Sequence, residues 1–151
     1  MGNDNKLVLL VEDNVDDESL TLRALRKNNI MNEVVVACDG LDALDYLFAR
    51  ARHADRDKSQ MPALIILDLS LPKLHGLDVL KEIRTHEETA LLPVVVLTSS
   101  EDEKQLEASI RLGANSFIHK PVDAQEYSEM ILQLGLYWLL LNHAPPLCER
   151  V

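Results

Sequence analysis

Four short runs of apolar residues and one apolar pair, Phe117-Ile118, are distributed along the chain, and each precedes a segment in which apolar residues recur every three or four positions. A continuous apolar run between turn residues is typical of a strand buried on both faces of a sheet. Apolar residues at intervals of three or four positions indicate a helix with one buried face. The runs predict strands at residues 6–11, 33–38, 64–67, 93–97 and 115–119. The periodic segments predict helices at about residues 14–28, 41–51, 76–87, 100–113 and 123–141.

This strict alternation of strands and helices predicts an α/β fold with a parallel sheet, because successive parallel strands need a crossover between them. Right-handed crossovers place helices on both faces and give a three-layer αβα sandwich. Residues 50–60 are polar, charged and without periodicity, so we expect a solvated surface loop there. The length of 151 residues is sufficient for one domain with a substantial core.

The composition and the charge limit the classes of partner and the cellular compartment that we expect. The formal net charge of −10 argues against non-specific binding to nucleic acid or to an anionic membrane. No apolar run approaches the roughly 20 residues of a membrane span, and the chain begins without a signal-peptide core. Cys38 and Cys148 lie far apart in the sequence and lack metal-site spacing, so we expect two reduced thiols in a cytoplasmic protein.

The third apolar run, Leu64–Leu67, leads directly into the carboxylate of Asp68. An isolated aspartate in this position most often caps a turn or a helix. In a parallel sheet, however, the carboxyl ends of all strands lie along one edge, where α/β folds bind their ligands. The residues that follow the other strands at this edge are Glu12 and Asp13, Thr98, and Lys120. We therefore expect these side chains to gather around Asp68.

Such a group of side chains has a defined chemistry. Three carboxylates in close proximity need a counter-charge to remain ionised. Mg²⁺ is the usual cation for a few carboxylates and waters, so we predict a magnesium site at Glu12, Asp13 and Asp68. A carboxylate in this setting can attack phosphorus and form an aspartyl phosphate. Lys120 would neutralise charge on the phosphoryl oxygens, and the hydroxyl of Thr98 would donate a hydrogen bond to one of them.

In order and spacing, these residues resemble the receiver domain of two-component response regulators. The similarity rests on Glu12-Asp13, Leu67-Asp68-Leu69, Pro72, Gly76, Thr98 and Lys120-Pro121. It extends over residues 6–141, which leaves residues 1–5 and 142–151 as terminal extensions and no output domain. It implies a five-stranded, flavodoxin-like sheet in the strand order 2-1-3-4-5 with five helices. The gap between Asp13 and Asp68 is longer than the family pattern, and residues 50–60 account for the difference.

The resemblance also implies roles for individual residues. Asp68 would accept a phosphoryl group from a sensor histidine kinase. The Mg²⁺ ligands would be Asp13, Asp68 and the backbone carbonyl of Ser70, with Glu12 acting mostly through water. The protein would then be a signalling protein and not an enzyme.

Two further expectations follow from the resemblance. Thr98 and Phe117 would form a switch pair, in which the aromatic ring moves inward when Thr98 turns toward the phosphoryl group. The segment Val94–Ser100 and the final helix with Trp138-Leu139 are similar to those of the small regulators partnered with bacterial phytochromes. A bacterial phytochrome is therefore the candidate kinase.

The last predicted helix carries two apolar stripes. The expected core stripe contains Tyr127, Met130, Ile131, Leu134, Tyr137, Trp138 and Leu141. A second stripe contains Leu132, Leu136, Leu139 and Leu140. A helix that is apolar on both sides is buried on both sides. We therefore predict a homodimer through the face formed by the fourth helix, the fifth strand and the fifth helix. The alternative is that the C-terminal tail folds back over these leucines.

Three other functions compete with the receiver interpretation. A haloacid-dehalogenase-type phosphatase also forms an aspartyl phosphate, but it has a second aspartate two residues after the nucleophile, where this chain has Ser70. A nucleotide or flavin carrier binds phosphate with a Gly-, Ser- or Thr-rich loop after the first strand. This chain has Glu12-Asp13 there, and these carboxylates would repel phosphate. A degenerate receiver that binds partners without phosphate would lack part of the residue set.

Overall fold

The computed structural model describes residues 7–27, 32–71, 74–99 and 103–141, apart from the side chains of residues 140 and 141. Its centre is a five-stranded parallel sheet in the order β2-β1-β3-β4-β5, which confirms the predicted fold class and strand order. The strands are β1 (Val8–Val11), β2 (Val34–Ala37), β3 (Leu64–Asp68), β4 (Val94–Thr98) and β5 (Ser116–His119). The helices are α1 (Val15–Lys27), α2 (Gly40–Leu47), α3 (Gly76–Thr85), α4 (Glu103–Arg111) and α5 (Ala124–Gly135). A 3₁₀ turn (Ala51–His53) follows α2, and a π-helical segment (Leu136–Leu141) follows α5.

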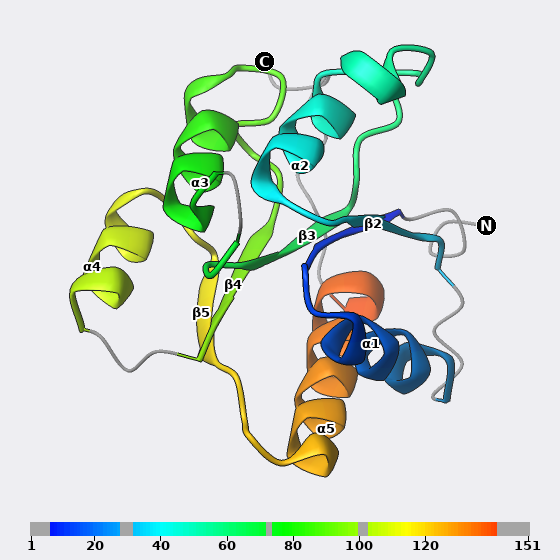
Figure 1. Ribbon diagram of the computed structural model, residues 1–151, viewed down its shortest axis with the longest axis vertical. Coiled ribbons are helices and arrows are strands. Elements are labelled where there is room, and N and C mark those ends of the chain that lie inside the picture. The colour runs from blue at the N-terminus through cyan, green and yellow to red at the C-terminus, as the bar shows by residue number, and fades with distance from the viewer. Residues whose placement is uncertain (1–6, 28–31, 72–73, 100–102, 142–151) are drawn as a thin grey trace.

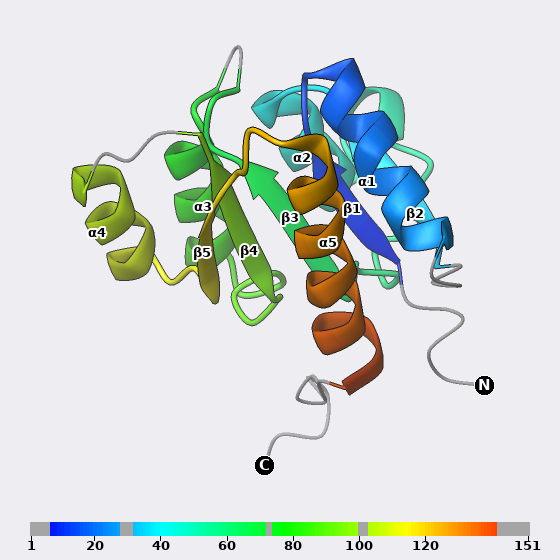
Figure 2. The ribbon, with the colours of Figure 1, turned by 90° about the horizontal axis from the view of Figure 1, so that it is seen from below.

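The helices form two layers around the sheet. Helices α1 and α5 cover one face, while α2 and α3 cover the other, with α4 beside α3 at the β5 edge (Figures 1 and 2). In β1, the side chains of Leu9 and Val11 pack in the core on the α2–α3 side, and those of Val8 and Leu10 pack in the core on the α1–α5 side. Because both faces are covered, the central strands are continuous apolar runs.

Some predicted boundaries are wrong, and some fall outside the described residues. Helix α2 ends at Leu47 rather than near residue 51, because Ala49 and Ala51 have positive φ angles of 53° and 51° that a right-handed helix cannot contain. Cys38 is a free thiol, as expected. Outside the described residues lie Cys148, Pro72, the extensions at 1–5 and 142–151, and the fourth helix's expected start at Ser100 or Glu101.

The segment at residues 50–60 is solvent-exposed, but it is anchored on α2. The guanidinium of Arg56 donates hydrogen bonds to the carbonyls of Tyr46 (2.6 Å) and Leu47 (3.2 Å) and lies 4.2 Å from the centroid of the Tyr46 ring. Arg52 and His53 bind the carboxylate of Asp42. These contacts attach the segment to α2, so it packs as part of the domain.

The end of α5 departs from the predicted pair of stripes. In the π-helical segment, Leu139 is fully buried while Tyr137 is 50% exposed. The sequence pattern predicts the opposite, with Tyr137 in the core stripe and Leu139 in the outer one. A π turn contains one residue more than an α turn, so Leu139 follows Leu134 as a fully buried residue, while Trp138 is half-buried against the same core. Leu132 is also half-buried against this core, so both Leu139 and Leu132 depart from the predicted outer stripe, and Leu136 remains exposed. The side chains of Leu140 and Leu141 are not among those that the structure describes.

Candidate functional site

Asp68 ends β3 at the carboxyl edge of the sheet, and its buried carboxylate has two defined partners. Oδ1 accepts a hydrogen bond from the backbone N–H of Ser70 at 2.9 Å. Oδ2 accepts one from Nζ of Lys120, also at 2.9 Å. The chain after β3 returns so closely that a Cβ at Gly76 would lie 2.6 Å from Cα of Leu69 and 2.9 Å from the carbonyl oxygen of Asp68. Only glycine fits there, so the turn that presents Asp68 depends on it.

Lys120 follows β5 and is fixed at both its backbone and its side chain. Its backbone N–H donates to the carbonyl of Thr98 at 2.7 Å, which continues the β4–β5 pairing. Its ammonium pairs with three carboxylates, at 2.7 Å from Asp17, 2.9 Å from Asp68 and 3.3 Å from Glu12. Burial alone would lower the pKa of this lysine, but its carboxylate partners outweigh burial and hold the pKa well above the usual value. Lys120 is therefore a permanent positive charge beside Asp68.

Glu12 is a buried acidic residue whose pKa responds to burial and to its charged neighbours. Its carboxyl, at the end of β1, is only 1% exposed. Burial and the neighbouring charge of Asp68 raise its pKa to about 8, although Lys120 acts in the opposite direction. One lysine contacts the carboxyl groups of Glu12, Asp17 and Asp68, so acidic groups outnumber the ammonium that they share.

The remaining imbalance suits a hard divalent cation. Glu12, Asp13 and Asp68 each offer an oxygen, and these oxygens lie within 4.8 Å of one another. Asp13 is exposed and Glu12 is buried, so the group is reachable from solvent on one side only. Oxygen ligands from two or three carboxylates, with room for water, are what Mg²⁺ accepts. Ser70 lines the same cleft.

The other predicted site residues lie on β4 and β5. Thr98 is fully buried as the last residue of β4. Phe117 lies on β5, opposite Val96 of β4, and is half-buried against the core on the α2–α3 side. The cleft itself has a volume of about 650 Å³. Its lining is mostly polar: Glu12, Asp13, Asn14, Val15, Asp16, Asp17, Asp68, Ser70, Ser99, Lys120, Pro121 and Val122.

Asp17 is the residue that the sequence analysis missed. It lies in the first turn of α1, not at a strand end, yet it makes the shortest of the three contacts to Lys120. A sequence signal existed, because α1 begins at the same edge of the sheet where β1 ends. The side chain of Asn14 accepts the N–H of Asp17 at 3.0 Å, which is the geometry of a helix cap.

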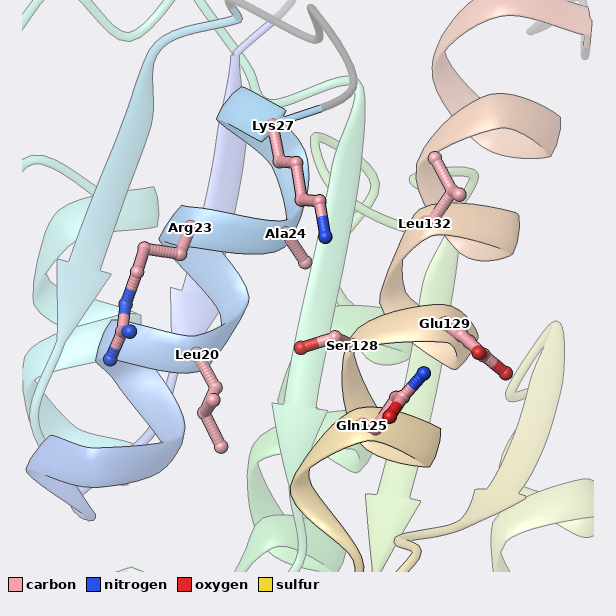
Figure 3. A pocket seen from close by; sticks show the side chains of 8 residues that line it. All are labelled: Leu20, Arg23, Ala24, Lys27, Gln125, Ser128, Glu129 and Leu132. Atoms are coloured by element: carbon pink, nitrogen blue, oxygen red, sulfur yellow. The ribbon is translucent and has the colours of Figure 1, made fainter.

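A second hollow lies between α1 and α5 and has a volume of about 300 Å³ (Figure 3). Leu20 and Ala24 of α1 and Leu132 of α5 form its apolar part, and Lys27 and Glu129 lie at its rim. A single carboxylate among apolar and cationic neighbours offers no set of ligands for a hard cation. The acidic cleft is therefore the better candidate for chemistry.

Comparison with known proteins agrees with this geometry. Residues 8–132 match the family described as response regulator receiver domain. The chain belongs to this family. Receivers of two-component systems are signalling proteins in which phosphorylation of an aspartate and binding of Mg²⁺ are general features.

The relatives of this receiver include regulators associated with phytochromes. It is 35% identical to the response regulator Rcp1 of Synechocystis over 138 residues, 91% of this chain and 92% of the relative. It superimposes on the phosphorylated cyanobacterial phytochrome response regulator RcpA with a TM-score of 0.87 and 34% identity, covering 94% of this chain and 99% of the other. The bacteriophytochrome response regulator AtBRR is 45% identical, with a TM-score of 0.72 and coverage of 92% and 99%. A Mn²⁺-bound form of Rcp1 is also among the similar structures.

In the part of the chain that the structure describes, no helix is long and apolar enough to cross a membrane.

Proposed function

We propose that this receiver accepts a phosphoryl group on the carboxylate of Asp68 from a sensor histidine kinase. The observation that carries the proposal is the pairing of Asp68 with Lys120 at 2.9 Å beside a group of three carboxylate oxygens that suits a divalent cation. Asp13, Asp68 and the carbonyl of Ser70 would hold Mg²⁺, with Glu12 acting mostly through water. When bound, Mg²⁺ supplies positive charge that offsets the charge on the phosphoryl oxygens.

The residues of the chain itself would divide the remaining work. Asp68 provides the attacking oxygen, and the N–H of Ser70 orients its carboxylate through Oδ1. Lys120 offers donors to a phosphoryl oxygen from the position where it now contacts Oδ2. The hydroxyl of Thr98 would donate to a second phosphoryl oxygen. Burial of these groups strengthens each interaction, because the local dielectric constant is lower than that of water.

The test of the phosphoacceptor uses acetyl phosphate as the donor. The chain is incubated with Mg²⁺ and acetyl phosphate and separated on a phosphate-affinity gel. We expect a shifted band for the unaltered chain, no shift for Asp68→Asn, and a normal shift for Asp78→Asn, which removes an exposed carboxylate in the first turn of α3. An unshifted wild type would refute the proposal, and an equally shifted Asp68→Asn would move the phosphoacceptor elsewhere.

For the partner, we propose a histidine kinase of the bacterial phytochrome class. The support is the similarity to RcpA, Rcp1 and AtBRR over nearly their whole length. Purified kinases from several sensor classes, each labelled on histidine, would be mixed with the receiver for short times. Transfer should be fastest from a phytochrome kinase, and equal rates from unrelated kinases would contradict the assignment.

For the output, we propose that the signal leaves the receiver, residues 6–141, through contacts with other proteins. Phosphorylation would turn Thr98 toward the phosphoryl group, and the ring of Phe117 would move inward into the space that Thr98 vacates. This proposal is supported by the position of Phe117, whose half-buried ring sits between core and surface. A fluorinated phenylalanine at position 117 should report two ring environments by ¹⁹F NMR, with and without phosphate. A single unchanged resonance would contradict the switch.

The proposed homodimer uses the face of α4, β5 and α5. Apolar side chains remain exposed on this part of the chain, including Ile110 of α4 (61%) and Leu136 after α5 (38%). Sedimentation equilibrium should show a dimer, and Ile110→Glu should dissociate it. Leu91→Glu is the matched control, because Leu91 is similarly exposed (56%) but lies between α3 and β4. A monomer alone at tens of micromolar would contradict a constitutive dimer.

A further inference from the structure

Lys120 has three carboxylate partners, and one of them differs from the others in its location. Glu12 and Asp68 belong to the group whose oxygens could hold a cation. Asp17 does not belong to that group, yet its Oδ2 lies 2.7 Å from Nζ of Lys120, closer than either of the other two. The lysine is therefore shared between the cation site and one carboxylate on α1.

Asp17 is held in place by hydrogen bonds on both sides of its backbone. Its N–H donates to Oδ1 of Asn14 at 3.0 Å, and its carbonyl accepts the hydroxyl of Thr21 at 2.8 Å. That hydroxyl is also 3.2 Å from the hydroxyl of Tyr127 on α5. Nζ of Lys120 lies 5.9 Å from the centroid of the Tyr127 ring. Residues of α1 and α5 that contact one another thus lie beside the ammonium of Lys120.

A cation and Lys120 compete for the same carboxylates. The ammonium now neutralises part of the charge on Glu12 and Asp68, and a divalent cation between these groups would repel it. Without another partner, the buried ammonium would either stay and repel the cation, or be displaced with loss of its ion pairs to Glu12 and Asp68; both would weaken cation binding. Asp17 offers a partner outside the cation group within the present reach of the lysine.

We propose that Asp17 is a positioning residue that retains Lys120 beside Asp68 while a divalent cation occupies the site at Glu12, Asp13 and Asp68. The inference rests on the proposed function, because it presupposes the cation site. Asp17 itself binds neither the cation nor the phosphoryl group.

The test is the affinity for Mg²⁺, measured by titration calorimetry on the full chain without any phosphoryl donor. Asp17→Asn should weaken Mg²⁺ binding by about tenfold, which is typical for loss of a residue that acts through a ligand's neighbour. The matched control is Asp16→Asn. Asp16 is the adjacent acid in the same first turn and lines the same cleft, but its carboxylate is not one of the three that pair with Lys120. The control should change the affinity by less than about twofold, since it alters only the distant charge and the interaction with the helix dipole.

The same substitutions in a Lys120→Met background separate positioning from general electrostatics. Without the lysine, Asp17→Asn should weaken Mg²⁺ binding no more than Asp16→Asn does. A purely electrostatic role would give the same or a larger loss in this background. Equal effects of the two substitutions in the unaltered background would overturn the inference, and that comparison decides even if Lys120→Met fails to fold.

Mg²⁺ binding by the unaltered chain and its variants distinguishes failure of the inference from failure of the proposed function. If the unaltered chain binds Mg²⁺ and Asp13→Asn abolishes this binding, the cation site stands. An Asp17→Asn variant that then binds Mg²⁺ like the unaltered chain overturns the positioning role alone. Absence of Mg²⁺ binding in the unaltered chain would overturn both.

Discussion

The carboxylate of Asp42, whose partners are separate from those of the phosphoacceptor, should make the stability of the domain depend on pH. This buried side chain, in the first turn of α2, accepts hydrogen bonds from the guanidinium of Arg52 at 2.7 and 3.0 Å and from the ring of His53 at 2.9 Å. Burial raises the pKa of Asp42, but these bonds and the N–H of Cys38 outweigh burial and lower the pKa to about 2.

The direction and size of this pH dependence follow from the difference between the pKa of Asp42 in the folded and in the unfolded chain. A carboxyl whose pKa is lower in the folded chain contributes stability above its unfolded pKa and loses it as the pH falls through the folded pKa. The fall from 3.8 to about 2 corresponds to about 2 kcal/mol at pH 7 and roughly half of that at pH 3. Because Arg52 is 65% exposed, solvent screening reduces its share of this contribution.

The assay is urea unfolding of the unaltered chain and Asp42→Asn at pH 7 and pH 3. We expect the substitution to cost up to about 2 kcal/mol at pH 7, and the difference between the two proteins to shrink by about half at pH 3. The control is Asp45→Asn, because Asp45 lies on the same helix and pairs with the exposed Arg50 at 3.5 Å. It should cost less than about 1 kcal/mol at either pH. A difference for Asp42→Asn that is the same at both pH values would refute the reasoning.

Three other substitutions test the packing. Gly76→Ala should destabilise the domain by about 2 kcal/mol and slow labelling by acetyl phosphate, because its Cβ would meet the backbone of the phosphoacceptor turn; unchanged labelling and stability would contradict the close approach. Leu139→Ala should lower the free energy of unfolding in urea by about 3 kcal/mol and Leu136→Ala by less than about 1 kcal/mol, because only Leu139 is buried. The reverse order would instead support a regular α-helix through this segment. Thr21→Val should lower the free energy of unfolding by about 1–2 kcal/mol, because it leaves the buried hydroxyl of Tyr127 without this partner; a melting temperature equal to that of the unaltered chain would argue against the contact.

The fold could be predicted because the strands are covered on both faces. In β3 and β4 every residue is buried, so the apolar runs contain no polar interruption. Element boundaries were harder to predict where the backbone leaves regular geometry at a residue type that does not usually mark such a change. The left-handed conformations at Ala49 and Ala51 end α2, yet glycine or asparagine is the usual signal for such a turn.

The prediction for the end of α5 was wrong for a related reason. Apolar residues occupy nearly every position from Leu134 to Leu139, so the sequence allows more than one buried row. The choice between Trp138 and Leu139 depends on a single π turn, which composition does not reveal. The predicted outer stripe was consequently too wide, although Leu136 remains on the surface.

The candidate site was predictable as far as topology alone determines it. Glu12 and Lys120 each follow a parallel strand and Asp68 is the last residue of one, and the carboxyl ends of parallel strands lie at one edge of the sheet. The contribution of α1 required one further fact, the rotational phase of the helix. Adjacent residues differ by about 100° around an α-helix, so only one of Asp16 and Asp17 can face Lys120. The hydrogen bond from the N–H of Asp17 to Oδ1 of Asn14 sets that phase, and it directs Asp17 toward the lysine.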